Sequence, residues 1–256
     1  PSHADFTYQA KYGIRDYRGG GRASARETAT RVAAGAIAKK ILHLKYKISC
    51  LAYVTQIHTL KATNIPKNLS LTQIEKNIIR CPDQKTAKKM IESIEKAKKE
   101  GNSLGGIITG LIKNVPAGIG EPVFNKLKAT LGHAMLSIPA TMGFQIGSGF
   151  ESVTKTGLEH NDAFYQENNK VKTKTNYSGG IQGGISNGQP IYFDVAFKPT
   201  ATINKEQQTI NKKGESIKLK AKGRHDPCVL PRAVPIIESM SALTILDLIL
   251  IHNSKN

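Results

Sequence analysis

The sequence has little of several residue types, and each shortage excludes a class of protein. Its 256 residues include no tryptophan, only 6% aromatic residues and three cysteines. Three widely spaced cysteines (Cys50, Cys81 and Cys228) are too few for a disulfide framework or a zinc ribbon, so we expect a reducing compartment. The longest apolar run, Leu243 to Ile251, contains Asp247 and is far shorter than the roughly 20 residues of a membrane span. These shortages exclude a disulfide-rich secreted domain and a membrane protein.

The sequence also lacks an initiator methionine, because it opens on Pro1. We therefore expect either that a segment has been removed or that the chain is part of a longer one. We expect a cytoplasmic protein, and an organelle-targeting leader on a precursor stays open as an alternative.

Acidic residues are scarce too, so the chain is strongly basic. Lysine and arginine total 37 against 19 for aspartate and glutamate, a formal net charge of 37 − 19 = +18. A positive field of this size favours anionic partners. Nucleic acid is one candidate, although the low aromatic content provides no stacking platform for bases. A small polyanionic ligand is the other, and it requires a local cluster of arginines rather than a diffuse lysine coat.

Hydrophobic periodicity predicts a mixture of helices and strands. Helix signals mark residues 24–44, 84–100, 122–138 and 231–253. Strand signals mark residues 46–59, 103–114, 143–151 and 192–197, with a hairpin at 209–221. The segments 64–77 and 155–177 are expected to be exposed loops. Because strands and helices do not alternate regularly, we predict an α+β fold in a single domain over residues 1–256.

Some positions within these elements carry specific expectations. The helix that begins near Pro122 is expected to turn Phe124 and Leu127 inward, with Pro122 in its first turn. Ser24 and Glu27 fit the capping-box pattern at the start of the first of these helices. The C-terminal helix is expected to bury one apolar face, made of Ile236, Met240, Leu243 and Leu246.

The strongest local signal lies between Arg15 and Glu27. Three successive glycines precede the capped helix start, and four arginines surround them: Arg15, Arg18, Arg22 and Arg26. Glycine lets backbone N–H groups approach a ligand, and arginine offers paired donors to phosphate or carboxylate. We interpret the segment as an anion site; a flexible loop with solvated arginines is the alternative. The pattern is neither a P-loop nor a Gly-x-Gly-x-x-Gly turn, so nucleotide hydrolysis and Rossmann-type binding lack support.

Three weaker signals could also carry chemistry. A His225-Asp226 pair lies in the turn sequence GRHDPC at 223–228 and suits a general base, although adjacent side chains need not face the same space. His3 stands near the start of the chain, where a surface histidine is the common alternative. Lys198-Pro-Thr200 follows a strand and could hold a phosphate. The other histidines have no metal-ligand spacing, so we expect no metal site.

Taken together, these segments resemble the chorismate synthase family. The resembling pieces run in order along nearly the whole chain: PSHAD at 1–5, YGIRDYRGGGRASARET at 12–28, RVAAGAIAK at 31–39, VPAGIGEPV at 115–123, GGIQGGISNG at 179–188, KPT at 198–200 and GRHDPCV at 223–229. Several of them are too long to arise by chance. For the fold, the resemblance implies a β-α-β sandwich with antiparallel sheets packed around helices.

For the chemistry, the resemblance implies a carbon–oxygen lyase of the shikimate pathway. Members of the family eliminate phosphate and a C6 hydrogen from 5-enolpyruvylshikimate 3-phosphate in an anti-1,4 sense, with no net redox change, to give chorismate. They require reduced FMN, which is thought to lend an electron to the substrate and recover it. The substrate carries one phosphate and two carboxylates and the flavin adds another phosphate, so both ligands need the arginines described above.

The resemblance also assigns roles to residues of this sequence. It implies a flavin site at Arg22, Ala23, Ser24, Pro139, Ala140, Gly183, Lys198, Pro199, Thr200, Ala201, Thr202 and Arg224. It implies substrate contacts at Arg26 and Arg224. His3 resembles a histidine near the flavin ring that stabilises charge on the reduced ring. Asp226 resembles a carboxylate near flavin N5 that accepts a proton.

The sequence departs from the family pattern at several points. The family's N-terminal segment, with the histidine that protonates the leaving phosphate, is missing from this chain. Ala23 and Ala201 stand where serine is frequent, and Met142 and Gln145 replace a lysine and a glutamate, which indicates a lost ion pair. A truncated, catalytically impaired fragment that keeps its anion binding is therefore the alternative to an active enzyme.

For partners, the resemblance implies a homotetramer and no binding of nucleic acid or membrane. It also associates the family with NADP. No reductase domain is visible in the sequence, so we expect a separate flavin reductase to supply the reduced FMN.

Overall fold

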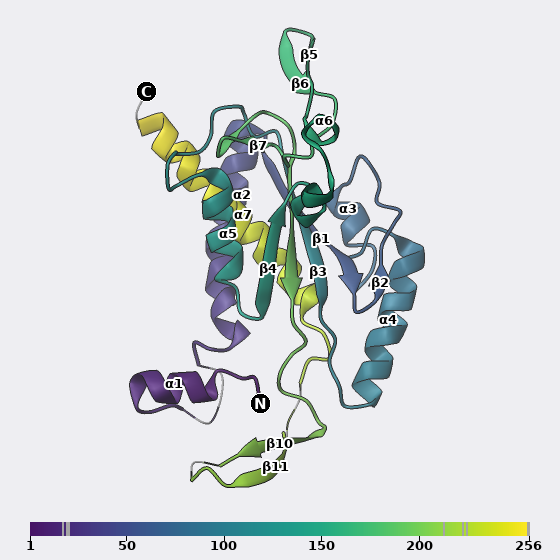
Figure 1. Cartoon of the computed structure of the whole chain (residues 1–256), viewed down its shortest axis with the longest axis vertical. Coiled ribbons are helices and arrows are strands. Elements are labelled where there is room, and N and C mark those ends of the chain that lie inside the picture. The colour runs from purple at the N-terminus through teal and green to yellow at the C-terminus, as the bar shows by residue number, and fades with distance from the viewer. Residues whose placement is uncertain (17, 19–20, 212, 222, 224, 255–256) are drawn as a thin grey trace.

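The centre of the molecule is a five-stranded antiparallel sheet with the strand order β2-β1-β3-β9-β4 (Figure 1). The computed structural model describes every residue except 17, 19–20, 212, 222, 224 and 255–256. The strands of this sheet are β1 (Ser49–Ile57), β2 (Leu60–Lys61), β3 (Gly106–Lys113), β4 (Thr141–Ile146) and β9 (Ile191–Phe197). Antiparallel strands packed against helices confirm the predicted α+β class.

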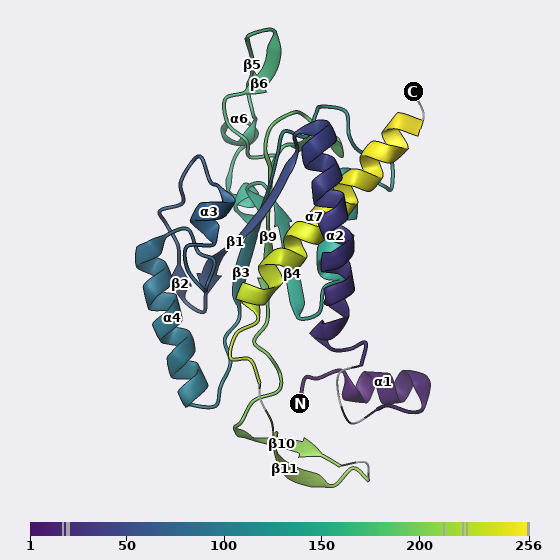
Figure 2. The same ribbon diagram turned by 180° about the vertical axis from the view of Figure 1, so that it is seen from behind.

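Three helices cover one face of the sheet: α2 (Thr28–Tyr46), α5 (Leu127–Leu136) and α7 (Leu230–Ser254). Figure 2 shows α2 and α7 in front of the strands. In β9, residues Ile191, Phe193, Val195 and Phe197 are buried, and the residues between them are partly exposed. Because strand side chains alternate between faces, this apolar row joins the helices in one core.

Helices α2 and α7 approach each other closely at Gly35. A Cβ atom added to Gly35 would lie 2.2 Å from the Cβ of Ser239 in α7. Ser239 itself is buried, and its hydroxyl donates to the carbonyl of Pro235 at 2.7 Å. A glycine facing a small serine therefore sets how near the two helix backbones lie.

A buried carboxylate ties these helices to the sheet. Glu238 of α7 forms an ion pair with Lys39 of α2, and its Oε1 accepts a hydrogen bond from the backbone N–H of Ala52 at 3.2 Å. The N–H of Ala52 points to the edge of β1 that does not pair with β3. On the same edge, the N–H of Val54 donates to the carbonyl of Arg80 at 3.0 Å. A buried carboxylate needs such partners to offset its desolvation, so Glu238 fixes α2, α7 and β1 relative to one another.

Helix α7 is long and apolar enough to cross a membrane by length and composition alone. The short run considered above, Leu243 to Ile251, is only part of it. In this fold, however, 56% of the apolar stretch is buried inside the protein, and α7 packs against α2, α5 and the sheet. It is the central core helix of the fold. Its expected inward face is in place, because Ile236 is buried and Met240, Leu243 and Leu246 pack against the core.

Polar side chains from three strands form a network on the opposite face of the sheet. The carboxylate of Asp194 accepts a hydrogen bond from the Thr109 hydroxyl at 2.6 Å and another from the Gln145 amide at 2.9 Å. Met142 is largely exposed. The uncharged amide of Gln145 thus bonds directly to Asp194, where a glutamate would place two carboxylates together.

The remaining elements surround this central unit. Short helices are α1 (Asp5–Tyr12), η1 (Ala25–Glu27), α3 (Leu71–Ile74), η2 (Gly149–Thr154) and α6 (Gly157–His160), and a longer one is α4 (Gln84–Lys99). The hairpins are β5 (Phe164–Glu167) with β6 (Lys170–Thr173), β7 (Ile181–Gln182) with β8 (Ile185–Ser186), and β10 (Glu206–Ile210) with β11 (Ser216–Lys220).

The amphipathic helix predicted at 84–100 is confirmed as α4. The carboxylate of Asp83 caps it by accepting from the N–H of Thr86 at 3.2 Å, and Gly101 follows its end with a φ of 67°. The buried residues Ala87, Met90 and Ala97 lie along one side of it. Capping at both ends and a clean apolar stripe made this element readable from sequence.

The helix predicted to begin near Pro122 is wrong in its start. Helix α5 begins at Leu127, and Phe124 is 90% exposed instead of buried. Glu121 forms an isolated β-bridge with Asn125, and the N–H of Leu127 donates to the carbonyl of Gly184 at 2.8 Å. Residues 122–124 therefore form a turn closed by this bridge, and the long-range bond of Leu127 to Gly184 sets where the helix begins.

The predicted loops also contain regular structure. Residues 155–177 include α6 and the β5–β6 hairpin, which turns at Asn168 and Asn169 with φ of 49° and 59°. Asparagine tolerates this left-handed backbone, which suits a tight hairpin turn. Residues 64–77 include α3, and the strand predicted to reach 151 ends at Ile146, where η2 follows shortly after. Helix α1 was not predicted.

The α2–α7 crossing gives a stability prediction. We expect Gly35→Ala to lower the free energy of unfolding by about 1–3 kcal/mol or more, because the new methyl group would overlap Ser239. Urea denaturation followed by circular dichroism measures this. Gly157→Ala is the matched control, since a Cβ there meets nothing within 4 Å, and it should leave stability unchanged. Equal stability of the two variants would show that the crossing is not tightly packed.

Candidate active site

A cavity of about 1510 Å³ opens where α2 and α7 both begin, at the lower end of the sheet in Figure 1. Five segments that are far apart in sequence line it. They are residues 2–8, residues 22–32, the turn at 136–140 after α5, the segment 197–202 after β9, and residues 225–236 at the start of α7. The fold therefore gathers the motif-bearing segments of the sequence at one place.

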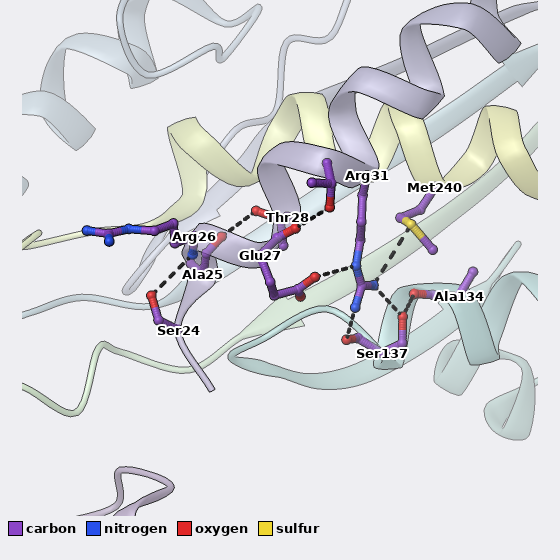
Figure 3. A network of polar contacts seen from close by, with 10 residues as sticks. Ser24, Ala25, Arg26, Glu27, Thr28, Arg31, Ala134, Ser137 and Met240 are labelled. Atoms are coloured by element: carbon purple, nitrogen blue, oxygen red, sulfur yellow. Dashed lines mark hydrogen bonds and ion pairs between the residues drawn. The ribbon is translucent and has the colours of Figure 1, made fainter. Parts of the chain in front are cut away.

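The segment that leads into α2 supplies the short helix η1, which is capped by Ser24, and two arginines. The hydroxyl of Ser24 accepts a hydrogen bond from the N–H of Arg26 at 3.2 Å, so Ser24 is the cap that its sequence indicated. Arg22 and Arg26 line the cavity with exposed side chains. Among the described residues, neither guanidinium has an ion-pair partner, and Arg26 points away from the neighbouring polar network (Figure 3). Both arginines are thus available to a bound anion.

Glu27 does not complete a capping box with Ser24. Its carboxylate instead accepts from Nε of Arg31 at 2.9 Å, one helical turn later. Arg31 also donates from Nη1 to the Ser137 hydroxyl at 2.7 Å and from Nη2 to the Ser137 carbonyl at 3.3 Å. Figure 3 shows this guanidinium between the start of α2 and the end of α5. Arg31 therefore holds two walls of the cavity together.

The segment after β9 is tied to three other parts of the cavity. The N–H of Lys198 donates to the carbonyl of Ala140 at 3.0 Å, and its ammonium donates to the carbonyl of Ser2 at 3.0 Å. The hydroxyl of Thr200 donates to the carbonyl of Asp226 at 2.9 Å, and the Thr200 carbonyl accepts from the Ser103 hydroxyl at 2.8 Å. This loop is therefore held in place without a ligand.

Asp226 lines the cavity beside His225 and Arg232. Its Oδ2 lies 3.0 Å from Nη1 of Arg232. His225 has a ring nitrogen, Nε2, that is buried with no hydrogen-bond partner among the described residues. Burial raises the pKa of the neighbouring Cys228 thiol to about 11, so this cysteine is a protonated thiol near neutral pH and no nucleophile. No group of three or more His, Cys, Asp or Glu side chains in the described part is arranged to hold a metal ion.

His3 lines the cavity from the N-terminal segment. Its Nδ1 lies 3.4 Å from a carboxylate oxygen of Asp5, and about half of its side chain is exposed. Asp5 also pairs with Arg15, from Oδ1 to Nη1 at 2.8 Å. The histidine is thus held near the cavity by one polar contact.

The structure brings together most of the residues that the sequence pointed to. Those that line the cavity are His3, Arg22, Ala23, Ser24, Arg26, Pro139, Ala140, Lys198, Thr200, Ala201, Thr202 and Asp226. Pro199 lies between two lining residues but does not line the cavity itself. Gly183 lies elsewhere, in the turn between β7 and β8. Arg224 falls outside the described residues.

Sequence reasoning gave no site role to several polar lining residues, among them Arg31, Ser137 and Arg232. Arg31 lies in a quoted motif. Arg232 follows Asp226 by six residues across the apolar stretch 227–231, so its closeness in sequence is the one local signal for it. Ser137 had no signal, because only the packing of α5 against α2 brings it to Arg31.

This fold and cavity define an α+β protein with a pocket lined by arginines and a lysine, which suits polyanionic ligands. The chorismate synthase family model matches residues 1–250 of the chain. A chorismate synthase from Gloeothece citriformis is 57% identical over 256 residues, which is all of this chain and 71% of that protein. Another from Cytophaga hutchinsonii is 59% identical over 248 residues, covering 96% of this chain and 69% of that protein.

A solved structure gives the same result. A crystal structure of chorismate synthase matches with a TM-score of 0.77 and 29% identity, covering 97% of this chain and 70% of that one. The chain belongs to the chorismate synthase family. It is accordingly a lyase that acts on a phosphate, in the biosynthesis of aromatic compounds.

The Arg31 network gives a prediction about the cavity walls. We expect Arg31→Gln to lower the free energy of unfolding by about 2 kcal/mol, because hydrogen bonds from a charged group to Glu27 and Ser137 are lost. Thermal and chemical unfolding measure it. Arg18→Gln is the control, because Arg18 pairs with Asp16 only two residues away, and it should unfold like the parent chain. A matching loss in both variants would deny Arg31 its bridging role.

Proposed function

We propose that this chain converts 5-enolpyruvylshikimate 3-phosphate into chorismate with the help of reduced FMN. The observation that carries the proposal is the convergence at one cavity of nearly all residues that the family resemblance assigns. Of the described residues among them, Gly183 and Pro199 do not line it. These residues come from five separate segments, so their convergence is a property of the fold and not of a single motif.

The cavity suits two polyanions. Its volume of about 1510 Å³ exceeds the roughly 300–1,000 Å³ of a pocket for one drug-sized ligand. Among the described residues, five cationic side chains line it (Arg22, Arg26, Arg31, Lys198 and Arg232), against two carboxylates. The start of η1, just before α2, adds backbone donors. A phosphate in such a site replaces its hydration by fixed, charge-assisted hydrogen bonds.

Within this proposal, Arg22, Ser24 and the segment 198–202 hold the flavin phosphate and ring. Arg26 binds an anionic group of the substrate. Reduced FMN, when bound, supplies an electron that is returned, so the reaction has no net redox change. The substrate loses its C–O bond to phosphate and its C6 hydrogen, and gains a second ring double bond.

Two side chains handle charge and protons in this scheme. His3 stabilises negative charge on the reduced ring. Its single contact with Asp5 leaves the imidazole able to turn toward the ring. Asp226 accepts a proton from the ligand side of the cavity. The Thr200 hydroxyl holds the backbone of Asp226 at 2.9 Å, so binding of the cofactor to segment 198–202 and the position of the acceptor are mechanically linked.

The proposed enzyme has a source of reduced flavin, an oligomeric state and a compartment. A separate flavin reductase supplies the reduced FMN. The enzyme works as a homotetramer. It acts in the cytoplasm, where free thiols such as those of Cys50, Cys81 and Cys228 persist.

The direct test is an anaerobic assay with the substrate and chemically reduced FMN, following chorismate and released phosphate. We expect turnover by the parent chain. Asp226→Asn should lower kcat by about 100-fold or more, as expected for loss of a proton acceptor, with flavin affinity nearly intact. Absence of turnover by the parent chain would contradict the proposed function, and unchanged kcat in Asp226→Asn would remove Asp226 from the mechanism.

The flavin site is tested separately by binding. We expect Arg22→Ala to weaken binding of oxidised FMN by about 10- to 100-fold, because one charge-assisted hydrogen bond to phosphate is lost. Quenching of flavin fluorescence measures the affinity. Lys218→Ala is the control, since Lys218 lies on β11 and pairs with Glu206 at 2.9 Å. An unaltered affinity in Arg22→Ala would end its assigned role.

A further inference from the structure

Asp226 stands between two cavities. It lines the large cavity, and it also lines a second one of about 470 Å³ that lies against Cys228 and the segment 75–80. Arg232 is the other residue with side-chain charge that lines both. The ion pair between them, 3.0 Å from Nη1 to Oδ2, thus forms part of the partition between the two spaces.

The backbone and the side chain of Asp226 are held by different groups. Its carbonyl oxygen accepts from the Thr200 hydroxyl at 2.9 Å. In the part of the chain that the structure describes, the carboxylate pairs with the side chain of Arg232. About a third of the Asp226 side chain is exposed, so without Arg232 the carboxylate would be free to rotate toward either cavity.

Arg232 is itself on a fixed support. It lies in the first turn of α7, and its N–H donates to the carbonyl of Val229 at 3.0 Å. Arg80 donates from its guanidinium to the carbonyl of Pro231, the residue before Arg232, and from Nε to Glu75 at 2.9 Å. The carbonyl of Arg80 accepts from Val54 of β1 at 3.0 Å. The backbone that carries Arg232 is therefore tied to the central sheet.

We propose that Arg232 is a positioning residue that holds the carboxylate of Asp226, as an anion, in the orientation needed to accept a proton in the large cavity. A guanidinium suits this task because it is rigid, planar and always charged, and its Nη1 lies 3.0 Å from Oδ2 of Asp226. Arg232 acts on the reaction through Asp226 and not by holding substrate. This inference rests on the proposed function, because Asp226 matters only if it is the acceptor.

A double-mutant cycle tests the claim. In the parent chain, Arg232→Gln should lower kcat by about 10-fold or more, with substrate KM and FMN affinity within about twofold. In an Asp226→Asn background, the same change should cost less than about twofold, because the carboxylate it positions is already gone. Arg232→Lys should recover part of the lost kcat, since it keeps the positive charge but lacks the planar guanidinium.

Lys218→Gln is the matched control, because it breaks an exposed ion pair on β11, and its kcat should equal that of the parent chain. Equal losses from Arg232→Gln in both backgrounds would overturn the proposal. So would a loss carried by substrate KM, which would make Arg232 a substrate ligand.

A second readout does not depend on turnover. A crystal structure of ligand-free Arg232→Gln should show the Asp226 carboxylate rotated from its position in the parent chain, with the Thr200 hydroxyl still bonded to the Asp226 carbonyl. An unmoved carboxylate would overturn the positioning role. If the parent chain does not turn over, the proposed function fails, and this structure alone still decides whether Arg232 orients Asp226.

Discussion

The close crossing of α2 and α7 at Gly35 and Ser239 is the constraint on which the cavity depends. Arg22, Ser24 and Arg26 lie in the segment that leads into α2. Asp226 lies in the segment that leads into α7, and Arg232 lies in the first turn of α7. Because both helices are rigid rods, the distance between their starts is set by where and how closely they cross. The buried pair of Glu238 and Lys39 fixes the same crossing against β1.

The second physical theme is how a strongly cationic site is kept assembled. Like charges repel, so a cluster of arginines needs partners before any anion arrives. Arg31 pairs with Glu27 and Arg232 pairs with Asp226, whereas Arg22 and Arg26 have no ion-pair partner among the described residues. The site thus divides its arginines into those that build walls and those that meet ligand. Such preorganisation lowers the cost of binding a polyanion.

The sequence predicted the regular elements with strong local signals and failed where distant backbone contacts decide. Helix α4 was readable because Asp83 and Gly101 mark its ends. The structure of residues 121–125 was not readable from sequence, since the contact of Leu127 with Gly184 joins residues that are far apart in the chain. In the site, Arg22 and Ser24 could be recognised from sequence, because they follow three glycines and Ser24 is a typical helix-capping residue. Ser137 and Arg232 could not be recognised in this way, because each depends on a partner that only the fold brings into contact: Arg31 for Ser137 and Asp226 for Arg232.

A crystal structure of this chain with FMN and 5-enolpyruvylshikimate 3-phosphate tests the central claim most directly. The claim is that both polyanions bind between the starts of α2 and α7. We expect the flavin phosphate against Arg22, Ser24 and the segment 198–202, and the substrate beside Arg26, with Asp226 facing the flavin ring. If both ligands bind with the affinity measured in solution but lie outside this cavity in the crystal, the account is contradicted.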